Sequence, residues 1–180
     1  MSDSIILVGL MGSGKSTVGR QLAKCFERPF YDSDQEIVRR TGATIPMIFE
    51  LEGEAGFRAR EEDAIADLAK MSGIVLATGG GAVLSAKNRA QLAKQGIVVY
   101  LRGSPEELWQ RTRHDKNRPL LQVHDPKARL VQLYTERDAL YREVADVVVD
   151  TGRQSVHVLV DELAQHLSFL LRRSRDERTG

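Results

Sequence analysis

The sequence predicts an α/β fold in which helices flank a parallel sheet of five strands. Five short apolar runs rich in β-branched residues alternate with segments of helical periodicity along the 180 residues. Runs that are apolar throughout, such as Ile5–Val8, are typical of strands buried on both faces of a parallel sheet. This first run leads directly into Gly9–Thr17, a glycine-rich loop that opens the first helix.

The remaining elements follow from apolar spacing and from residues that begin or end helices. Ser33 with Glu36 forms a capping box, so we expect a helix that begins near residue 34 and ends at Gly42. A loop framed by Gly53 and Gly56 separates the next two helices. Further strands are expected at 30–31, 74–77, 97–101 and 147–149, and further helices at 45–51, 57–70, 85–95, 104–113, 125–141 and 156–170.

The composition is that of an ordinary globular domain, with 42% hydrophobic and 28% charged residues. A net charge of +1 argues against nucleic acid as the main partner. The single cysteine, Cys25, excludes an internal disulfide, and its place beside an apolar helical stripe predicts a core residue. No leader precedes the first strand, and no apolar run approaches the roughly 18 residues that cross a bilayer.

These features favour a cytoplasmic enzyme without a membrane partner. Residues 1–171 are expected to form one domain, and the charged segment 172–180 a disordered tail. No long exposed apolar stripe demands a second subunit, so we expect a monomer.

The loop Gly9–Thr17 matches the phosphate-binding pattern G-x-x-x-x-G-K-[ST] at every specified position. Its glycines let the backbone curl so that several N–H groups point at one anion, and the following helix adds its positive end. Lys15 can then reach the outer phosphates of a nucleoside triphosphate, and the Ser16 hydroxyl is placed for Mg²⁺. The predicted ligands are ATP and Mg²⁺, and the predicted loop contacts are Gly12, Ser13, Gly14, Lys15, Ser16 and Thr17. The alternative is a glycine-rich turn with a chance lysine, which the flanking strand and helix disfavour.

Asp32 and Asp34 lie just after the second expected strand. The carboxyl ends of parallel strands form the edge at which open α/β sheets bind ligands, so both are candidate site residues. The alternative is that they only cap the helix that follows. The third strand ends in Thr78 and carries no terminal aspartate that could hold Mg²⁺. Asp32 is the natural substitute, directly or through water.

Three consecutive glycines, Gly79, Gly80 and Gly81, follow Thr78. A plain turn seldom needs three, so we favour a site where a ligand approaches the backbone closely. Arg58 and Arg60 begin the helix expected at 57–70. We expect one of them to face solvent and to pair with Glu61 or Glu62, and a surface role for both is the alternative.

The segment 112–124 is polar and basic, then apolar, without a clean period, which is typical of a long functional loop. Arg111, Arg113, Lys116 and Arg118 place positive charges in or beside it. Phosphoryl transfer benefits from a mobile lid that brings cations to the phosphates, and we interpret the segment as such a lid. The alternative is a solvated run of charges.

Taken together, these residues resemble the shikimate kinase family from Ile5 to about Gln154. Besides the phosphate-binding loop, the similarity rests on Asp32-Ser33-Asp34, Gly56-Phe57-Arg58, Gly79-Gly80-Gly81, Arg118-Pro119-Leu120-Leu121 and Glu136-Arg137 with Tyr141. The resemblance implies a three-layer P-loop kinase fold with strand order 2-3-1-4-5, like nucleoside monophosphate kinases. It also implies transfer of the γ-phosphoryl group of ATP to the 3-hydroxyl of shikimate, a step in chorismate and aromatic amino-acid biosynthesis.

The resemblance further implies a role for each matching residue. The catalytic residues would be Asp34, Lys15 and Arg118. Shikimate would be bound by Asp34, Arg58, Gly79, Gly80, Gly81 and Arg137, Mg²⁺ by Ser16 and Asp32, and the nucleotide by Arg111, Arg118 and Gln154 besides the loop. The chemistry agrees, because two arginines can clamp a carboxylate and an aspartate can accept the proton of an attacking hydroxyl.

Three other functions remain open from the sequence. A kinase of another small polyol acid, such as gluconate, would share the loop and the lid but would not need the Asp-Ser-Asp and Gly-Phe-Arg motifs. A regulatory protein of the same fold would lack a catalytic residue, and none is missing here. An RNA-associated ATPase would rest on the basic tail alone.

Overall fold

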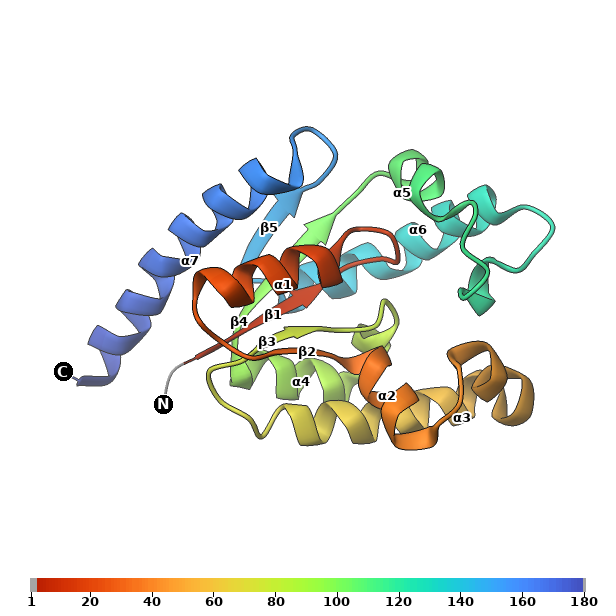
Figure 1. Cartoon of the computed structure of the whole chain (residues 1–180), viewed down its shortest axis with the longest axis horizontal. Coiled ribbons are helices and arrows are strands. Elements are labelled where there is room, and N and C mark those ends of the chain that lie inside the picture. The colour runs from red at the N-terminus through yellow and green to blue at the C-terminus, as the bar shows by residue number, and fades with distance from the viewer. Residues whose placement is uncertain (1–2, 180) are drawn as a thin grey trace.

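The computed structural model describes residues 3–179, which form one five-stranded sheet with helices on both faces (Figure 1). The strands are β1 (Ser4–Val8), β2 (Phe30–Asp32), β3 (Val75–Ala77), β4 (Gly96–Arg102) and β5 (Val147–Asp150). All neighbours pair in parallel in the order β2-β3-β1-β4-β5, which confirms the predicted sheet. Because β1 is central, the glycine-rich loop leaves from the middle of the carboxyl edge.

Alternate residues of β1 enter two different cores. Ile5 and Leu7 pack with α1 and α7, whereas Ile6 and Val8 pack with α3, α4 and α6 on the other face (Figure 1). All four side chains are fully buried, which is the physical reason for an apolar run without alternation. The helices are α1 (Lys15–Cys25), α2 (Ser33–Thr41), α3 (Ile45–Leu68), α4 (Ala86–Gln95), α5 (Pro105–Thr112), α6 (Pro126–Val144) and α7 (Val156–Thr179), with 3₁₀ turns at Ala82–Leu84 and Pro119–Leu121.

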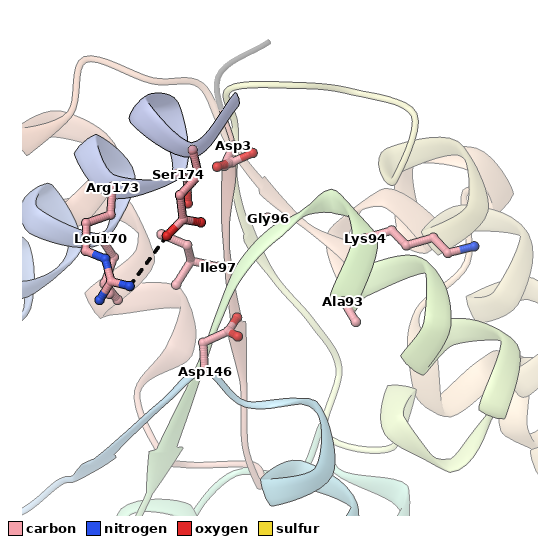
Figure 2. Close-up of a pocket in the computed structure, with 10 residues that line it drawn as sticks. Asp3, Ala93, Lys94, Gly96, Ile97, Asp146, Leu170, Arg173 and Ser174 are labelled. Atoms are coloured by element: carbon pink, nitrogen blue, oxygen red, sulfur yellow. Dashed lines mark hydrogen bonds and ion pairs between the residues drawn. The ribbon is translucent and has the colours of Figure 1, made fainter. Parts of the chain in front are cut away.

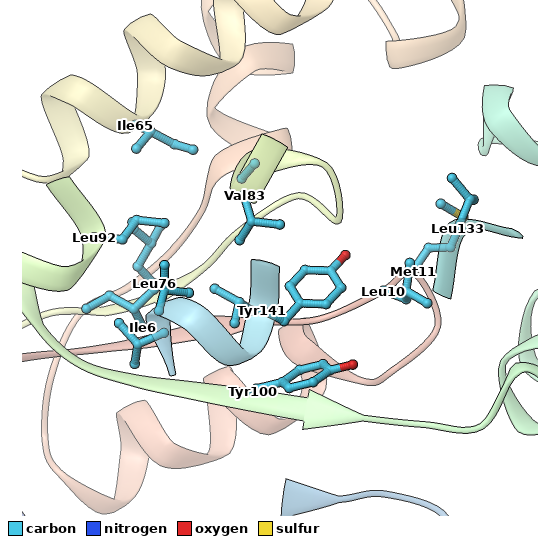
Figure 3. Close-up of a cluster of buried hydrophobic side chains, with 14 of the residues drawn as sticks. Ile6, Leu10, Met11, Ile65, Leu76, Val83, Leu92, Tyr100, Leu133 and Tyr141 are labelled. Carbon is cyan, nitrogen blue, oxygen red and sulfur yellow. The ribbon is translucent and has the colours of Figure 1, made fainter. Parts of the chain in front are cut away.

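Two tyrosines lie in the core between the sheet and α6 (Figure 3). The rings of Tyr100, from β4, and Tyr141, from α6, pack with their centroids 4.9 Å apart. Each hydroxyl has an acceptor: Asp138 for Tyr100 and the carbonyl oxygen of Gly80 for Tyr141. These contacts hold α6 against the carboxyl edge of the sheet.

The start of α2 differs from the expected capping box. Asp32, and not Ser33, caps the helix, because its Oδ1 accepts hydrogen bonds from the N–H groups of Asp34 (2.9 Å) and Gln35 (3.2 Å). Ser33 is the first helical residue, and its hydroxyl accepts the N–H of Gly79 at 2.9 Å. A tertiary contact therefore occupies the oxygen that the local pattern assigns to capping.

The loop expected between Gly53 and Gly56 is reduced to a kink inside α3. Gly53 has φ of 71° and ψ of −179°, and Gly56 stays within the helix. Thr44 caps the start by accepting the N–H of Met47. One glycine suffices because it tolerates the positive φ at which the helix changes direction.

The C-terminal segment is helical where the sequence predicts a disordered tail. α7 continues to Thr179, and residue 180 lies outside the described residues. Leu171 is buried, while Arg173 lies over the Phe169 ring and pairs with Glu177 at 3.5 Å. These contacts one turn apart support a helix. Among the described residues, neither α7 nor any other helix has the length and apolar character needed to cross a membrane.

The prediction that Cys25 lies in the core is wrong, because its side chain is exposed. The buried face of α1 follows Val18, Gly19, Leu22 and Ala23. Residue 25 closes the helix beside that face and turns to solvent.

Candidate active site

Two adjoining hollows lie at the carboxyl edge of the sheet. We name the first the phosphate hollow; it is lined by Gly12, Gly14, Lys15, Ser16, Thr17, Asp32, Asp34, Thr78, Gly79, Gly80, Arg111 and Arg118. We name the second the arginine hollow; it is lined by Met11, Asp34, Ile45, Phe49, Phe57, Arg58, Glu61, Gly79, Gly80, Gly81, Asn117, Arg118, Pro119, Leu120 and Arg137. Asp34, Gly79, Gly80 and Arg118 border both, so the hollows meet at these residues.

Lys15 is the first residue of α1 and is buried beneath the glycine loop. Its ammonium group donates to the carbonyl oxygens of Gly9 (2.6 Å) and Leu10 (2.9 Å). Burial and, to a smaller extent, the charge of Arg118 lower the pKa of Lys15 to about 7, against the opposing effect of two neighbouring aspartates. Phosphate oxygens are charged and therefore stronger acceptors than these carbonyls, so the lysine can exchange its partners for a nucleotide.

Asp32 joins the glycine loop to α2. Its Oδ2 accepts a hydrogen bond from the Ser16 hydroxyl at 2.6 Å, while its Oδ1 caps the helix. Asp32 therefore caps the helix and also lies in the candidate site, so both interpretations of this residue apply. Two hard oxygen donors from neighbouring segments fit Mg²⁺, which takes one or two protein ligands together with phosphate oxygens and water.

Two carboxylates converge on Gly79. A Cβ at this position would lie 2.7 Å from both Asp34 Oδ1 and Glu61 Oε2, so only glycine leaves room for them. Both oxygens are buried and have no hydrogen-bond partner among the described residues. Burial raises the pKa of Asp34, and the charge of Asp32 raises it further. Burial raises the pKa of Glu61 to about 7, against the attraction of Arg58.

Arg58 lines the arginine hollow, whereas Arg60 faces solvent. The Arg58 guanidinium donates to Glu61 at 2.9 Å and to Glu54 at 3.3 Å, and its Nε is buried without a partner. Arg60 faces solvent as expected, but it pairs with Glu52 and not with Glu61 or Glu62. Because a buried glutamate holds one arm of the fork, the Arg58 group is fixed within the hollow.

Arg137 reaches the same hollow from α6 and is only 3% exposed. Its Nε and Nη1 are buried and have no hydrogen-bond partner in the described part of the chain. Tyr141, one turn later, donates its hydroxyl to the carbonyl oxygen of Gly80 at 2.5 Å and so ties α6 to the glycine segment. Together with Arg58, Arg137 offers unpaired donors in one hollow, an arrangement that binds an anion such as a carboxylate.

Arg111 and Arg118 approach the phosphate hollow from α5 and from the segment after it. Arg111 Nη1 donates to the carbonyl oxygen of Gly12 at 3.0 Å. Arg118 lines both hollows, and its Nε donates to Asp115 at 3.0 Å. The segment 112–124 therefore brings a cation to the site, and its closing motion stays a prediction.

The structure does not bring Gln154 to either hollow. This residue lies between β5 and α7, and its amide donates to Glu162 at 3.0 Å. Sequence reasoning also missed Glu61. The available signal was its position, because the buried residues of the second half of α3 are Phe57, Glu61, Ala64, Ile65 and Leu68. A carboxylate within such an apolar stripe requires a buried partner.

A further hollow lies at the opposite end of the sheet, beside the start of β4 (Figure 2). Three of its polar side chains already serve the fold: Asp146 accepts the N–H of Val98 at 2.8 Å, and Arg173 pairs with Glu177. Open α/β sheets bind their ligands at the carboxyl ends of the strands. The phosphate and arginine hollows together are therefore the candidate active site.

A phosphate-binding loop that adjoins a hollow lined by three arginines and two carboxylates defines a P-loop kinase of a small acid. A family model described as shikimate kinase matches residues 11–168, and the chain belongs to this family. The family consists of ATP-dependent kinases, so the chain is an enzyme of that kind.

Individual relatives agree with this assignment. The shikimate kinase of Thiobacillus denitrificans is 66% identical over 93% of this chain and 92% of the relative. That of Burkholderia pseudomallei is 60% identical over 92% of this chain and 90% of the relative. A solved structure, the shikimate kinase from Acinetobacter baumannii in complex with shikimate, is similar with a TM-score of 0.90 at 51% identity over 93% of each chain.

Glu61→Gln should stabilise the chain increasingly as the pH rises. The pKa of Glu61 is about 7 in the folded chain against an ordinary 4.5, so its contribution to stability is present below about 4.5 and is lost as the pH rises through 7. The thermal midpoint of Glu61→Gln relative to wild type should therefore increase between pH 5 and pH 8. Glu62→Gln, which alters the neighbouring carboxylate 3.8 Å from Lys87, is the matched control. A difference for Glu61→Gln that stays flat over this range would contradict the shifted pKa.

Proposed function

We propose that this chain transfers the γ-phosphoryl group of ATP to the 3-hydroxyl of shikimate, giving shikimate 3-phosphate and ADP in chorismate and aromatic amino-acid biosynthesis. The observation that carries the residue roles is the junction of the two hollows, where Asp34 and Arg118 border both. In-line transfer requires the attacking hydroxyl and the γ-phosphate to meet at such a junction. Membership of the family supports shikimate as the acceptor.

The acceptor would be oriented by its carboxylate. Arg58 and Arg137 carry buried, unpaired nitrogens that can donate charge-assisted hydrogen bonds to this group. Phe49 and Phe57, with ring centroids 4.9 Å apart, form an apolar wall against which the carbon ring can pack. With the carboxylate at the arginines, the hydroxyls of the acceptor turn toward Asp34.

Asp34 would accept the proton of the attacking hydroxyl. Its Oδ1 is buried and unpaired, and its raised pKa makes it a stronger base than an ordinary aspartate. Because the transition state of phosphoryl transfer is loose, holding the hydroxyl in line contributes more than removing the proton. Lys15 and Arg118 would bind the phosphates and offset the negative charge that develops on them.

Ser16 and Asp32 would hold Mg²⁺ beside the phosphates. Their 2.6 Å hydrogen bond brings both oxygens to one point at the edge of the phosphate hollow. When bound, the ion neutralises charge on the β- and γ-phosphate oxygens. The adenine would lie beyond the phosphates, near Arg111 and the loop that carries Gln154.

We further propose a monomer in the cytoplasm without a nucleic-acid partner, built as one domain of residues 1–171 with a lid at 112–124. The sequence carries no long exposed apolar stripe that demands a second subunit, which supports the monomer. A dimer mass in light scattering would contradict the monomer.

Cleavage by trypsin near Lys116 should slow when ADP and shikimate are added, and an unchanged rate would count against the lid.

ADP formation measured with shikimate, with gluconate, with RNA and without an acceptor tests the function. We expect turnover to depend on shikimate. An equal rate with gluconate would favour the kinase of a different polyol acid, and stimulation by RNA alone would favour an RNA-associated ATPase. Either result would overturn the proposal.

Arg137→Lys should raise the KM for shikimate by roughly 10- to 100-fold, since a hydrogen bond to a charged group contributes about 1.5–3 kcal/mol. The substitution keeps the charge but loses the planar fork that matches a carboxylate. The KM for ATP should change little. Arg142→Lys is the matched control, because Arg142 lies on the same helix and pairs with Asp138 at the surface at 2.8 Å. Equal changes in both KM values would argue for a structural role of Arg137.

Asp32→Asn and Asp34→Asn should separate the metal from the acceptor. Asp32→Asn weakens metal use, so excess Mg²⁺ should restore part of the activity. Asp34→Asn cannot accept a proton and should lower kcat roughly 100-fold without rescue by Mg²⁺. Asp34→Ala should be slower still, because it also loses the group that positions the hydroxyl.

These three variants are compared by kcat and both KM values across a Mg²⁺ titration, with thermal melts to check the cap that Asp32 forms. Rescue of Asp34→Asn but not of Asp32→Asn would mean that the roles are exchanged. Wild-type behaviour of both asparagine variants would remove both residues from the active site.

A further inference from the structure

The direction of the Arg118 side chain depends on very few contacts. Residues 113–118 form neither helix nor strand, and within residues 3–179 the one backbone hydrogen bond of Arg118 is that from the N–H of Leu121 to its carbonyl oxygen at 3.0 Å. The guanidinium nevertheless lines both the phosphate hollow and the arginine hollow. A long side chain on an irregular segment has many rotamers, so a local contact must select the one that points to the junction.

Asp115 makes that contact. Its Oδ1 accepts the N–H of Asn117 at 2.8 Å, and its Oδ2 accepts Arg118 Nε at 3.0 Å. The carboxylate therefore fixes the backbone before Arg118 and the plane of the guanidinium at once. We propose that Asp115 is a positioning residue that aims Arg118 at the junction of the two hollows and thereby supports phosphoryl transfer; this inference rests on the proposed function.

Asp115 is itself anchored to the glycine loop through α5. Its N–H donates to the carbonyl oxygen of Thr112 at 2.9 Å, at the end of that helix. Thr112 packs so closely on the loop that a Cβ at Gly12 would lie 2.7 Å from its methyl group, and Arg111 donates to the carbonyl oxygen of Gly12. A short series of contacts thus links the phosphate-binding loop to the aspartate that holds Arg118.

The pairing geometry leaves Arg118 able to act on a ligand. Only its Nε has a hydrogen-bond partner in the part of the chain that the structure describes. Both Nη groups are therefore able to donate to phosphate oxygens while Asp115 keeps its hold on Nε. An end-on pair through the Nη groups would occupy the donors that a phosphate needs.

The ion pair contributes little to folding. The two side chains are 37% and 32% exposed, and exposed pairs three residues apart are weak. A role in stability alone therefore predicts that removing Asp115 leaves kcat unchanged. A role as a competitor that withholds Arg118 from the phosphates predicts a higher kcat. Positioning predicts a lower one.

The test is a double-mutant cycle of Asp115→Ala and Arg118→Ala, with kcat and both KM values measured for shikimate-dependent ADP formation. We expect Asp115→Ala to lower kcat roughly 10-fold, less than the ~100-fold that a displacement of about 1 Å can produce. Asp115→Asn keeps an acceptor for the N–H of Asn117 and should fall between wild type and Asp115→Ala. In the Arg118→Ala background, Asp115→Ala should change kcat by less than about 2-fold.

Asp125→Ala is the matched control. Asp125 lies at the other end of the same segment and caps α6 by accepting the N–H of Ala128 at 3.0 Å, without a contact to Arg118. It should lower the thermal midpoint and leave kcat near that of wild type.

If the wild type is active, a normal or raised kcat in Asp115→Ala would overturn this inference and leave the proposed function intact. So would an equal loss of kcat in the presence and absence of Arg118, because Asp115 would then act by another route. If Asp115→Ala does not fold, the same criteria apply to Asp115→Asn. A wild-type chain that forms no ADP with shikimate would instead overturn the proposed function.

Discussion

The carboxylate of Asp32 connects the two halves of the active site. Its Oδ1 fixes the first turn of α2, and its Oδ2 binds Ser16 in the glycine loop. Since Asp34 lies in that first turn, the same cap determines where its Oδ1 meets the backbone of Gly79. The spacing between the phosphate-binding loop and Asp34 therefore depends on one side chain that contacts both the helix and the loop.

Among the described residues, most of the buried polar side-chain atoms that lack a hydrogen-bond partner lie in this site, on Asp34, Arg58, Glu61 and Arg137. Each such group destabilises the fold by about 1–3 kcal/mol. They stay unpaired because α2, α3 and α6 hold them in fixed positions around the glycine segment. A bound acid with hydroxyl groups would supply the missing partners, so the free chain is preorganised for its ligand at the expense of its own stability.

Local chemistry explains which parts of the fold could be predicted. The glycine loop and the five strands each depend on residues close together in the sequence, and the structure contains all of them. The strand order came from the family resemblance, because apolar spacing gives strands without their neighbours. Two local predictions were wrong. The tail is helical because contacts one turn apart support α7, and the loop at Gly53 is only a kink because one glycine tolerates a positive φ inside α3.

The sequence by itself determined the phosphate-binding loop, the strands and the residue types that an acid-binding kinase needs, since these follow from spacing and side-chain chemistry. Only the tertiary structure decided how they meet. The Ser33 hydroxyl accepts the N–H of Gly79, and the Tyr141 hydroxyl donates to the carbonyl oxygen of Gly80. Glu61 comes to lie beside Asp34 because both contact one glycine. Such contacts join residues tens of positions apart, and they form only when helices pack on a sheet whose order no local pattern encodes.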